Sequence, residues 1–312
     1  MRDGRKSEGA ERPWTSKIVP LVAELSWIGF ILMMHSSRFE EPTLLVIPIK
    51  TRIITPDDDF LDVLVESLIA DGHELQDGDI LGVAETPLGT TQGRVVNLAD
   101  VNISHEAQEL SEKYDLLPAV AQLVLDEADE ILGGIPHVLL TIKDNTLMAN
   151  AGVDKSNVPP GHASLLPVDS SLSAEQLRQD AFKRYGKRIG VIVIDSRTQP
   201  LRLGNIGMAL GVSGFRPVAD DRGRKDLFGN ELRITRRAVA DNLASACTAV
   251  MGESNESIPG AIIRNAPVEF VNASFSSSEM WIEPEVCMYM AIFEQWRRGG
   301  PVAEGPARLK RK

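Results

Sequence analysis

The order of short β-rich runs and amphipathic helical segments along the chain is the feature that most restricts its fold. A β-rich run at 44–49 precedes apolar residues at helical spacing over 61–68, and a second β-rich run follows at 80–84. Further strand-like runs at 188–194 and 261–264 are separated irregularly by helical segments. A doubly wound sheet requires strands and helices to alternate strictly, and here they do not. We therefore predict an α+β fold with mixed sheets and flanking helices.

Capping residues predict where several helices begin. Ser173 followed by Gln176 has the spacing of a capping box, and Thr235 precedes another helical pattern. A further helix is expected over 118–132, and the buried-strand run at 188–194 is expected to end at Asp195. A carboxylate at the end of a strand is a candidate functional group.

The chain length bears on domain organisation. At 312 residues the chain is about twice the usual length of one compact unit, so we expect one large domain or two intertwined subdomains. We divide it into an appended N-terminal segment (1–40), a main domain (41–270) and a C-terminal helix with a basic tail (271–312). The apolar run at 18–34 contains a proline and a glutamate and falls short of the ~20 residues of a spanning helix. We therefore expect no stable membrane span.

Charge and cysteine content exclude some partners and compartments. Lys and Arg together number 33 against 44 Asp and Glu, a formal charge of −11, which repels a polyphosphate backbone. We therefore expect no nucleic-acid partner. Two cysteines supply no disulfide framework, so a reducing, cytoplasmic location is predicted.

Several common site motifs are missing from the sequence. It has no phosphate-binding G-x-x-x-x-G-K-[ST] loop, no G-x-G-x-x-G, no histidine pair at i, i+4 and no G-x-S-x-G. Carboxylates remain at Asp154, Asp195 and Glu253, in loops or at element ends. Magnesium or manganese is held by one or two such groups together with substrate phosphates. These carboxylates could equally be turn formers or solvated charges.

Several basic residues follow Asp195 in the sequence: Arg202, Arg222, Arg224 and Lys225. They can form an anion pocket, since arginine binds phosphate or carboxylate in bidentate fashion. They can also form surface ion pairs with the aspartates at 220, 221 and 226. Metal-binding carboxylates beside an arginine patch would suit phosphoryl transfer.

Five sequence blocks occur in order between about Leu44 and Arg264. They are IPIKTRIITPDDD (47–59), NAGVDKSNV (150–158), RIGVIVID (188–195), GRKDLFGNEL (223–232), and VAD (239–241) continuing to MGE (251–253). In these blocks the chain resembles the coenzyme F-420-0 gamma-glutamyl ligase family. The resemblance does not cover the N-terminal forty residues well, nor the last few dozen.

The resemblance implies a cytoplasmic, homodimeric ligase with intertwined protomers. It implies that GTP and Mg²⁺ or Mn²⁺, with K⁺ as a further cation, support the joining of L-glutamate to the carboxylate of a deazaflavin coenzyme precursor. The implied route passes through an acyl phosphate. Such a route is sensible because phosphorylation turns an oxygen of a poorly electrophilic carboxylate into a leaving group.

The resemblance also assigns site residues. The implied metal residues are Asp154, Asp195, Ser196 and Glu253, and the implied catalytic residues are Asp154, Asp195 and Arg202. The implied nucleotide-binding residues are Thr51, Arg52, Ile53, Ile54, Asn157, Met251, Gly252, Ser254 and Asn255. We also expect Glu85 and Thr90, in the stretch after the second strand, to lie at the nucleotide.

The chain departs from the family pattern at two places. A serine-lysine pair and a later lysine after the second strand are replaced in the stretch from Ala84 to Arg94, and the glycine-arginine turn after Asp195 is replaced by Arg197-Thr-Gln-Pro200. Losing the lysines and gaining Glu85 should weaken triphosphate binding by on the order of a few kcal/mol unless other groups compensate. Two alternatives therefore stay open: an amide ligase for a different acid and amine, and a non-catalytic member that binds a nucleotide or metal.

Overall fold

The computed structural model describes residues 43–291. All of these residues except Thr43 belong to one compact unit. The expected N-terminal segment 1–40, with its apolar run, lies outside the described residues, as do the basic tail and the end of the expected last helix, which starts at Met288 rather than at the expected Glu283. Within 43–291 no helix has the length and apolar character needed to cross a bilayer.

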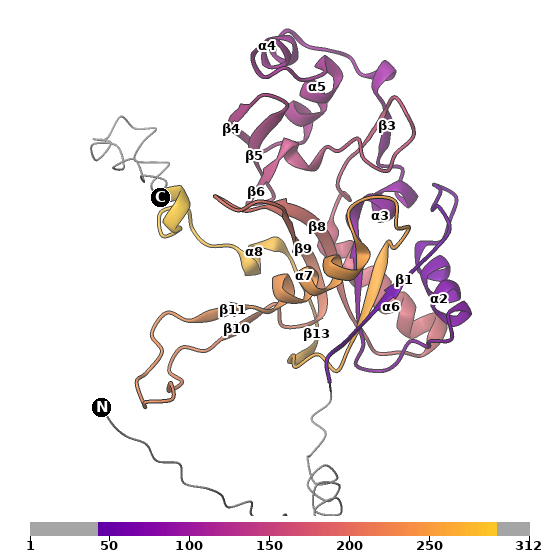
Figure 1. Cartoon of the computed structure of the whole chain (residues 1–312), viewed down its shortest axis with the longest axis vertical. Helices are drawn as coiled ribbons and strands as arrows, with labels where there is room; N and C mark the ends of the chain where they lie inside the picture. Colours follow the sequence, from indigo (N-terminus) through magenta and orange to yellow (C-terminus); the bar gives the residue numbers. More distant parts are fainter. Residues whose placement is uncertain (1–42, 292–312) are drawn as a thin grey trace, which may run out of the picture. The chain divides into compact units, whose positions relative to one another are not determined.

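A six-stranded mixed sheet forms the centre of the fold (Figure 1). β2 and β8 run parallel, with Ile80 opposite Gly190, and the other neighbouring pairs run antiparallel. The predicted α+β fold with mixed sheets is thereby confirmed. In sheet order the strands are β1 (Leu45–Ile49), β12 (Gly260–Arg264), β2 (Ile80–Ala84), β8 (Gly190–Thr198), β9 (Asn205–Phe215) and β13 (Phe270–Phe275).

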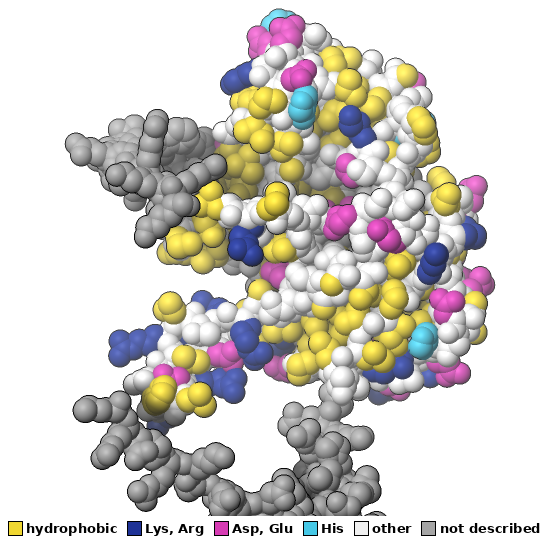
Figure 2. Space-filling model, in the orientation of Figure 1, with side chains coloured by type: hydrophobic (Ala, Val, Ile, Leu, Met, Phe, Trp, Pro, Cys, Tyr) yellow, Lys and Arg dark blue, Asp and Glu magenta, His cyan; other side chains and the backbone are white. Residues whose placement is uncertain are grey.

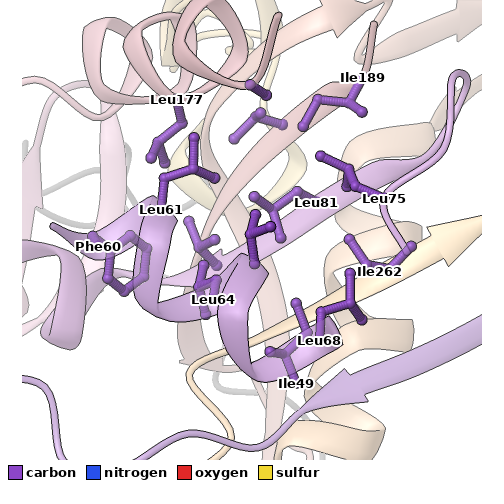
Figure 3. Close-up of a cluster of buried hydrophobic side chains, with 14 of the residues drawn as sticks. Ile49, Phe60, Leu61, Leu64, Leu68, Leu75, Leu81, Leu177, Ile189 and Ile262 are labelled. Carbon is purple, nitrogen blue, oxygen red and sulfur yellow. The ribbon is translucent and has the colours of Figure 1, made fainter. Parts of the chain in front are cut away.

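Helices cover both faces of this sheet. α2 (Phe60–Ala70) and α6 (Ser170–Tyr185) bury their apolar sides against one face, where Leu61, Leu64 and Leu68 meet strand residues such as Leu81 (Figure 3). α7 (Val239–Met251) packs on the other face. Each layer follows from the sequence, because apolar residues at helical spacing must be buried and the β-rich runs supply a surface that is apolar on both sides.

Residues 95–165, inserted between α3 (Glu85–Thr91) and α6, form a separate part of the fold, which we call the lobe. The lobe has its own hydrophobic cluster, which includes Val124, Leu139 and Leu165. Its strands are β3 (Val95–Asn97), β4 (Glu130–Ile135), β5 (Val138–Lys143), β6 (Thr146–Ala149) and β7 (His162–Ser164), and its helices are η1 (Leu98–Asp100), α4 (His105–Tyr114), α5 (Pro118–Glu127) and η2 (Asn150–Gly152).

A β-hairpin, residues 218–238, lies between β9 and α7 in the sequence. β10 (Val218–Asp220) pairs with β11 (Arg236–Ala238), and the turn between them carries Leu227 and Phe228, which are 99% and 90% exposed. Figure 2 shows hydrophobic side chains beside basic ones over this hairpin. The short helix α8 (Ser277–Met280) follows β13.

Several expected boundaries are wrong for identifiable reasons. β8 does not end at Asp195 but continues to Thr198, because residues 205–208 of β9 go on pairing with it. α6 starts at Ser170, where the Asp169 carboxylate caps the helix, rather than at the expected Ser173. α7 starts after Ala238, because Thr235 precedes the strand β11. The helix expected over 118–132 ends at Glu127.

Candidate active site

β8 brings two charged side chains to one face of the sheet. Asp195 and Arg197 are two residues apart, so both point to the same side of the strand. Arg197 Nε donates to Asp195 Oδ2 at 2.5 Å, and its Nη1 donates to the carbonyl oxygen of Leu147 in β6 at 3.1 Å. The Arg197 side chain is only 4% exposed, so this ion pair lies inside the protein.

Asp154 reaches the site from the lobe. Its backbone N–H donates to Ser164 at 3.1 Å and its carbonyl oxygen accepts from Ser164 at 2.7 Å, which fastens the loop after η2 to β7. Asp154 Oδ1 accepts from the backbone N–H of Lys155 at 2.7 Å and from the Ser156 hydroxyl at 3.1 Å. The residue itself is exposed, so its carboxylate is accessible to a ligand.

A third carboxylate, Glu85, begins α3 directly after β2. Its Oε1 accepts from the Thr86 hydroxyl at 2.8 Å. Burial raises the pKa of Glu85, and the charges of Asp195 and then Asp154 raise it further. Burial likewise raises the pKa of Asp195 against the opposing effect of Arg197. Glu85, Asp154 and Asp195 thus act on one another electrostatically, and we call them the carboxylate cluster.

Ser196 and Glu253 form a separate pair. The Ser196 hydroxyl donates to Glu253 Oε1 at 2.6 Å, which joins β8 to the loop that follows α7. Strand alternation turns Ser196 to the face opposite Asp195, the face that α7 covers. The expected metal residues therefore fall into two sets, with Asp154 and Asp195 in one and Ser196 and Glu253 in the other.

The carboxylate cluster suits a hard cation in its chemistry. Carboxylate oxygens are the ligands that Mg²⁺ and Mn²⁺ prefer, and the like charges of Glu85, Asp154 and Asp195 would be relieved by a cation. Among residues 43–291, however, no group of three or more His, Cys, Asp or Glu side chains is arranged to hold a metal by itself. A bound ion would therefore use two carboxylates and complete its coordination with phosphate oxygens and water.

The expected nucleotide-binding stretches lie side by side. The backbone N–H of Thr51 donates to Ser257 at 2.9 Å, and that of Ala84 donates to Pro259 at 2.9 Å. These two bonds bring 51–54, the start of α3 and 251–258 to the same end of the strands β1, β12 and β2.

The individual residues of these stretches differ in exposure. Arg52 Nη1 donates to Asp58 at 2.7 Å, and Ile54 packs against the core beneath α2. The Thr90 hydroxyl donates to the carbonyl of Thr86 at 2.9 Å within α3, and Asn157 has a left-handed backbone at φ 54°. Thr51 and Met251 are buried, whereas the following members of the set are exposed: Ile53, Asn157, Gly252, Ser254 and Asn255.

The basic residues do not gather at the carboxylate cluster. Arg202 is exposed in the turn between β8 and β9. Arg222 pairs with Asp220 at 2.5 Å and Arg224 pairs with Asp221 at 2.5 Å, all at the base of the hairpin. Arg222 and Arg224 thus form the surface ion pairs of the alternative interpretation, and Lys225 is exposed on the same hairpin.

Sequence reasoning missed Arg197 as a member of the site. Asp241 lies in the first turn of α7, on the opposite face of the sheet; it accepts from the backbone N–H of Ala209 at 3.0 Å, and burial raises its pKa against the effects of that bond and of the Arg197 charge. A signal for Arg197 was present, because an i, i+2 spacing from Asp195 places both on one strand face. It does not indicate a shared strand face if the strand is expected to end at Asp195.

These observations define a mixed α/β protein with carboxylates converging from a central sheet and an inserted lobe. The family model described as F420-0:Gamma-glutamyl ligase matches residues 48–265, and the chain belongs to that family. Among similar curated proteins are those named Coenzyme F420:L-glutamate ligase from Methanococcus maripaludis (43% identical, covering 65% of this chain and 82% of the relative), Methanopyrus kandleri (38%; 73% and 89%) and Methanocaldococcus jannaschii (44%; 64% and 80%).

Proposed function

We propose that the protein is a glutamate ligase that joins L-glutamate to the carboxylate of a deazaflavin coenzyme F420 precursor at the expense of GTP. The observation that carries the proposal is the match to the family over 48–265, which includes Asp154 on the lobe and Asp195 on β8. The names of the curated relatives support the amino acid and the coenzyme.

In the proposed reaction, an oxygen of the precursor carboxylate attacks the γ-phosphorus of GTP and GDP leaves. The glutamate amine then attacks the carbonyl carbon of the acyl phosphate, phosphate leaves, and the amine loses a proton to give the amide. Mg²⁺ or Mn²⁺, held by Asp154 and Asp195, would neutralise the phosphate charge, with Ser196 and Glu253 beside a further ion and K⁺ as an additional cation.

The chain's own groups would orient the substrates. The adjoining stretches 51–54 and 251–258, with Thr90 and Asn157, form the proposed nucleotide edge, and Arg202 on its exposed turn would contact an anionic group of the acceptor. Arg197 would fix the orientation of the Asp195 carboxylate, because its Nε donates to Asp195 Oδ2.

An assay with defined substrates tests this function. The protein is incubated with GTP or ATP, Mn²⁺, L-glutamate and the deazaflavin precursor, and products are weighed by mass spectrometry. We expect a product heavier by one or more glutamyl residues and release of GDP. Absence of any glutamylated product with either nucleotide would contradict the proposal.

Replacing Asp154 tests the site directly. We expect Asp154→Asn to abolish turnover while leaving the melting temperature nearly unchanged, because an exposed carboxylate that faces a metal contributes little to folding without the metal. Rates at the wild-type level in this variant would refute its role.

A ligase acting on a different acid and amine is the second candidate. Glu85 favours it, because this carboxylate belongs to the cluster and would oppose a triphosphate where a lysine would attract one. Glutamyl transfer would then fail with the deazaflavin precursor, while nucleotide hydrolysis would appear with another acid. A non-catalytic member would bind Mn²⁺ and turn over no nucleotide with any acceptor.

Homodimerisation and a cytoplasmic location belong to the same proposal. The exposed Leu227 and Phe228 at the hairpin turn supply an apolar surface that a second copy could cover.

The free thiols of Cys247 and Cys287 suit a reducing compartment, and burial raises the pKa of Cys247 to about 12, which keeps its thiol protonated.

A further inference from the structure

We propose that Arg197 is a positioning residue that ties the strand carrying Asp195 to the lobe carrying Asp154. It would hold the two carboxylates at the separation that one divalent ion requires. The inference rests on the proposed function only in assigning the ion to those two carboxylates. Nothing in the sequence or family match assigns a role to this arginine.

The geometry places Arg197 between two separately packed parts of the protein. Asp195 lies on β8, whose neighbours belong to the clusters that flank the central sheet, whereas Asp154 lies in the lobe, which has its own hydrophobic cluster. One guanidinium spans the two parts, with Nε on Asp195 at 2.5 Å and Nη1 on the Leu147 carbonyl of β6 at 3.1 Å.

The chain segment that joins Leu147 to Asp154 is short, and hydrogen bonds hold it in place. β6 ends at Ala149, the single turn η2 follows at once, and the Asp154 backbone is bonded in both directions to Ser164. The hydroxyl of Thr141 on β5 donates to the Met148 carbonyl at 2.9 Å and accepts from the Ala151 N–H at 2.8 Å, which fixes β6 to η2. A shift of β6 relative to β8 would therefore move Asp154 relative to Asp195.

Burial of Arg197 makes a purely structural role a poor explanation. Taking a guanidinium out of water carries a desolvation cost, and well-packed apolar residues often replace a buried ion pair without loss of stability. Arg197 Nη2 also finds no hydrogen-bond partner among the described residues, and a buried donor without a partner is destabilising. Such costs are typical of functional sites, where geometry outweighs stability.

The substitution Arg197→Lys separates geometry from charge. Lysine keeps the positive charge beside Asp195 but is a point donor, so it lacks the planar fork that reaches Asp195 and Leu147 together. If Arg197 acted only through its charge, R197K would bind a cation as the wild type does. Arg197→Gln would then bind it more tightly, because a repelling charge is removed.

Binding of Mn²⁺ alone to the full chain, followed by electron paramagnetic resonance, provides the test. We expect R197K to weaken Mn²⁺ binding about tenfold and R197Q to weaken it at least as much. The matched control is Arg216→Lys, because Arg216 forms an exposed ion pair with Glu269 at 2.8 Å; it should bind Mn²⁺ as the wild type does. An R197K dissociation constant within twofold of the wild type, or tighter binding by R197Q, overturns the inference.

Hydrogen exchange gives a second measurement that does not depend on metal loading. Without metal, R197K should speed amide exchange in β6 and in the loop bearing Asp154, and R216K should not. Should neither Arg197 variant fold, Mn²⁺ added to the wild type should slow exchange in β6 and at the end of β8 together. If Mn²⁺ slows amide exchange at the end of β8 but not in β6, the proposed positioning role of Arg197 is contradicted.

Failure of this inference can be told from failure of the proposed metal site. If Asp154→Asn and Asp195→Asn both leave Mn²⁺ binding unchanged, the ion does not bind at these carboxylates, and the proposed function and the inference fall together. If both weaken Mn²⁺ binding while R197K does not, the metal site stands and only the positioning role of Arg197 is overturned.

Discussion

At the scale of single residues, Glu175 shows how a charge on α6 contributes to stability. Its Oε1 accepts from Arg178 at 2.8 Å, and its Oε2 accepts from the buried hydroxyl of Ser213 on β9 at 2.5 Å. Hydrogen bonding to Arg178 and then to Ser213 lowers the pKa of Glu175 to about 2 against the effect of burial. The folded state thus favours the ionised carboxylate, which links α6 to the sheet.

We expect Glu175→Gln to lower the free energy of unfolding by about 1–2 kcal/mol at pH 7, because charge-assisted hydrogen bonds are lost. Since the folded pKa is depressed, the contribution of Glu175 is full above the unfolded value near 4.5 and is lost as the pH falls toward 2. Urea unfolding at several pH values should therefore show the wild type and E175Q converging in acid. A gap that stays constant to pH 2 would contradict this account, and Glu112→Gln on the exposed side of α4 is the control.

The candidate site could be predicted in part from its residues. The sequence predicts Asp154 and Asp195 as carboxylates suited to a hard cation, and the charge of Asp154 adds to burial in raising the pKa of Asp195. The spacing of Arg197 from Asp195 did not by itself indicate the ion pair, because charged residues after an apolar run indicate the end of a strand unless a partner is known. The burial of Arg197 depends on Asp195 and on a carbonyl fifty positions away, a long-range pairing that a local pattern does not contain.

At the scale of elements, β2 and α7 pack so closely that the strand requires glycine. A Cβ placed on Gly82 would lie 2.5 Å from Cys247 Sγ and 2.9 Å from Ile194 Cδ1. We expect Gly82→Ala to reduce the free energy of unfolding by about 1–3 kcal/mol through overpacking. In a urea-unfolding double-mutant cycle, Cys247→Ala should recover part of that loss, because it removes the sulfur. Strict additivity of the two substitutions would show that the sulfur contact is not responsible.

Elements with strong periodicity were predictable, and those that depend on tertiary contacts were not. The spacing of apolar residues located α2, and the β-rich run at 80–84 located β2. α3 was not expected as a helix, because its seven residues include a proline, a glycine and three threonines. It forms with Pro87 in the first turn, where no backbone donor is needed, and with Gly89 close to the Leu165 carbonyl of the lobe.

At the scale of the whole molecule, the fold places the carboxylate cluster where two independently packed parts meet. β8 of the sheet contributes Asp195, the start of α3 directly after β2 contributes Glu85, and the lobe contributes Asp154. Sequence order could not reveal this meeting, because the lobe is inserted between α3 and α6 and returns through β7. An arrangement of this kind lets the relative position of the two parts govern whether the carboxylates can share a ligand.

The hairpin at 218–238 tests the proposed homodimer at the same scale. Leu227 and Phe228 lie almost fully in solvent at its turn, and exposed apolar side chains of this size are typical of surfaces that a partner covers. We expect Leu227→Asp with Phe228→Asp to shift the protein from dimer to monomer in sedimentation velocity, because dimerisation would bury two charges. Ile135→Asp, at an exposed end of β4, should remain dimeric, and its melting temperature shows the general effect of one added aspartate. A wild type that sediments as a monomer, or a hairpin variant that stays dimeric, would show that the hairpin does not mediate self-association.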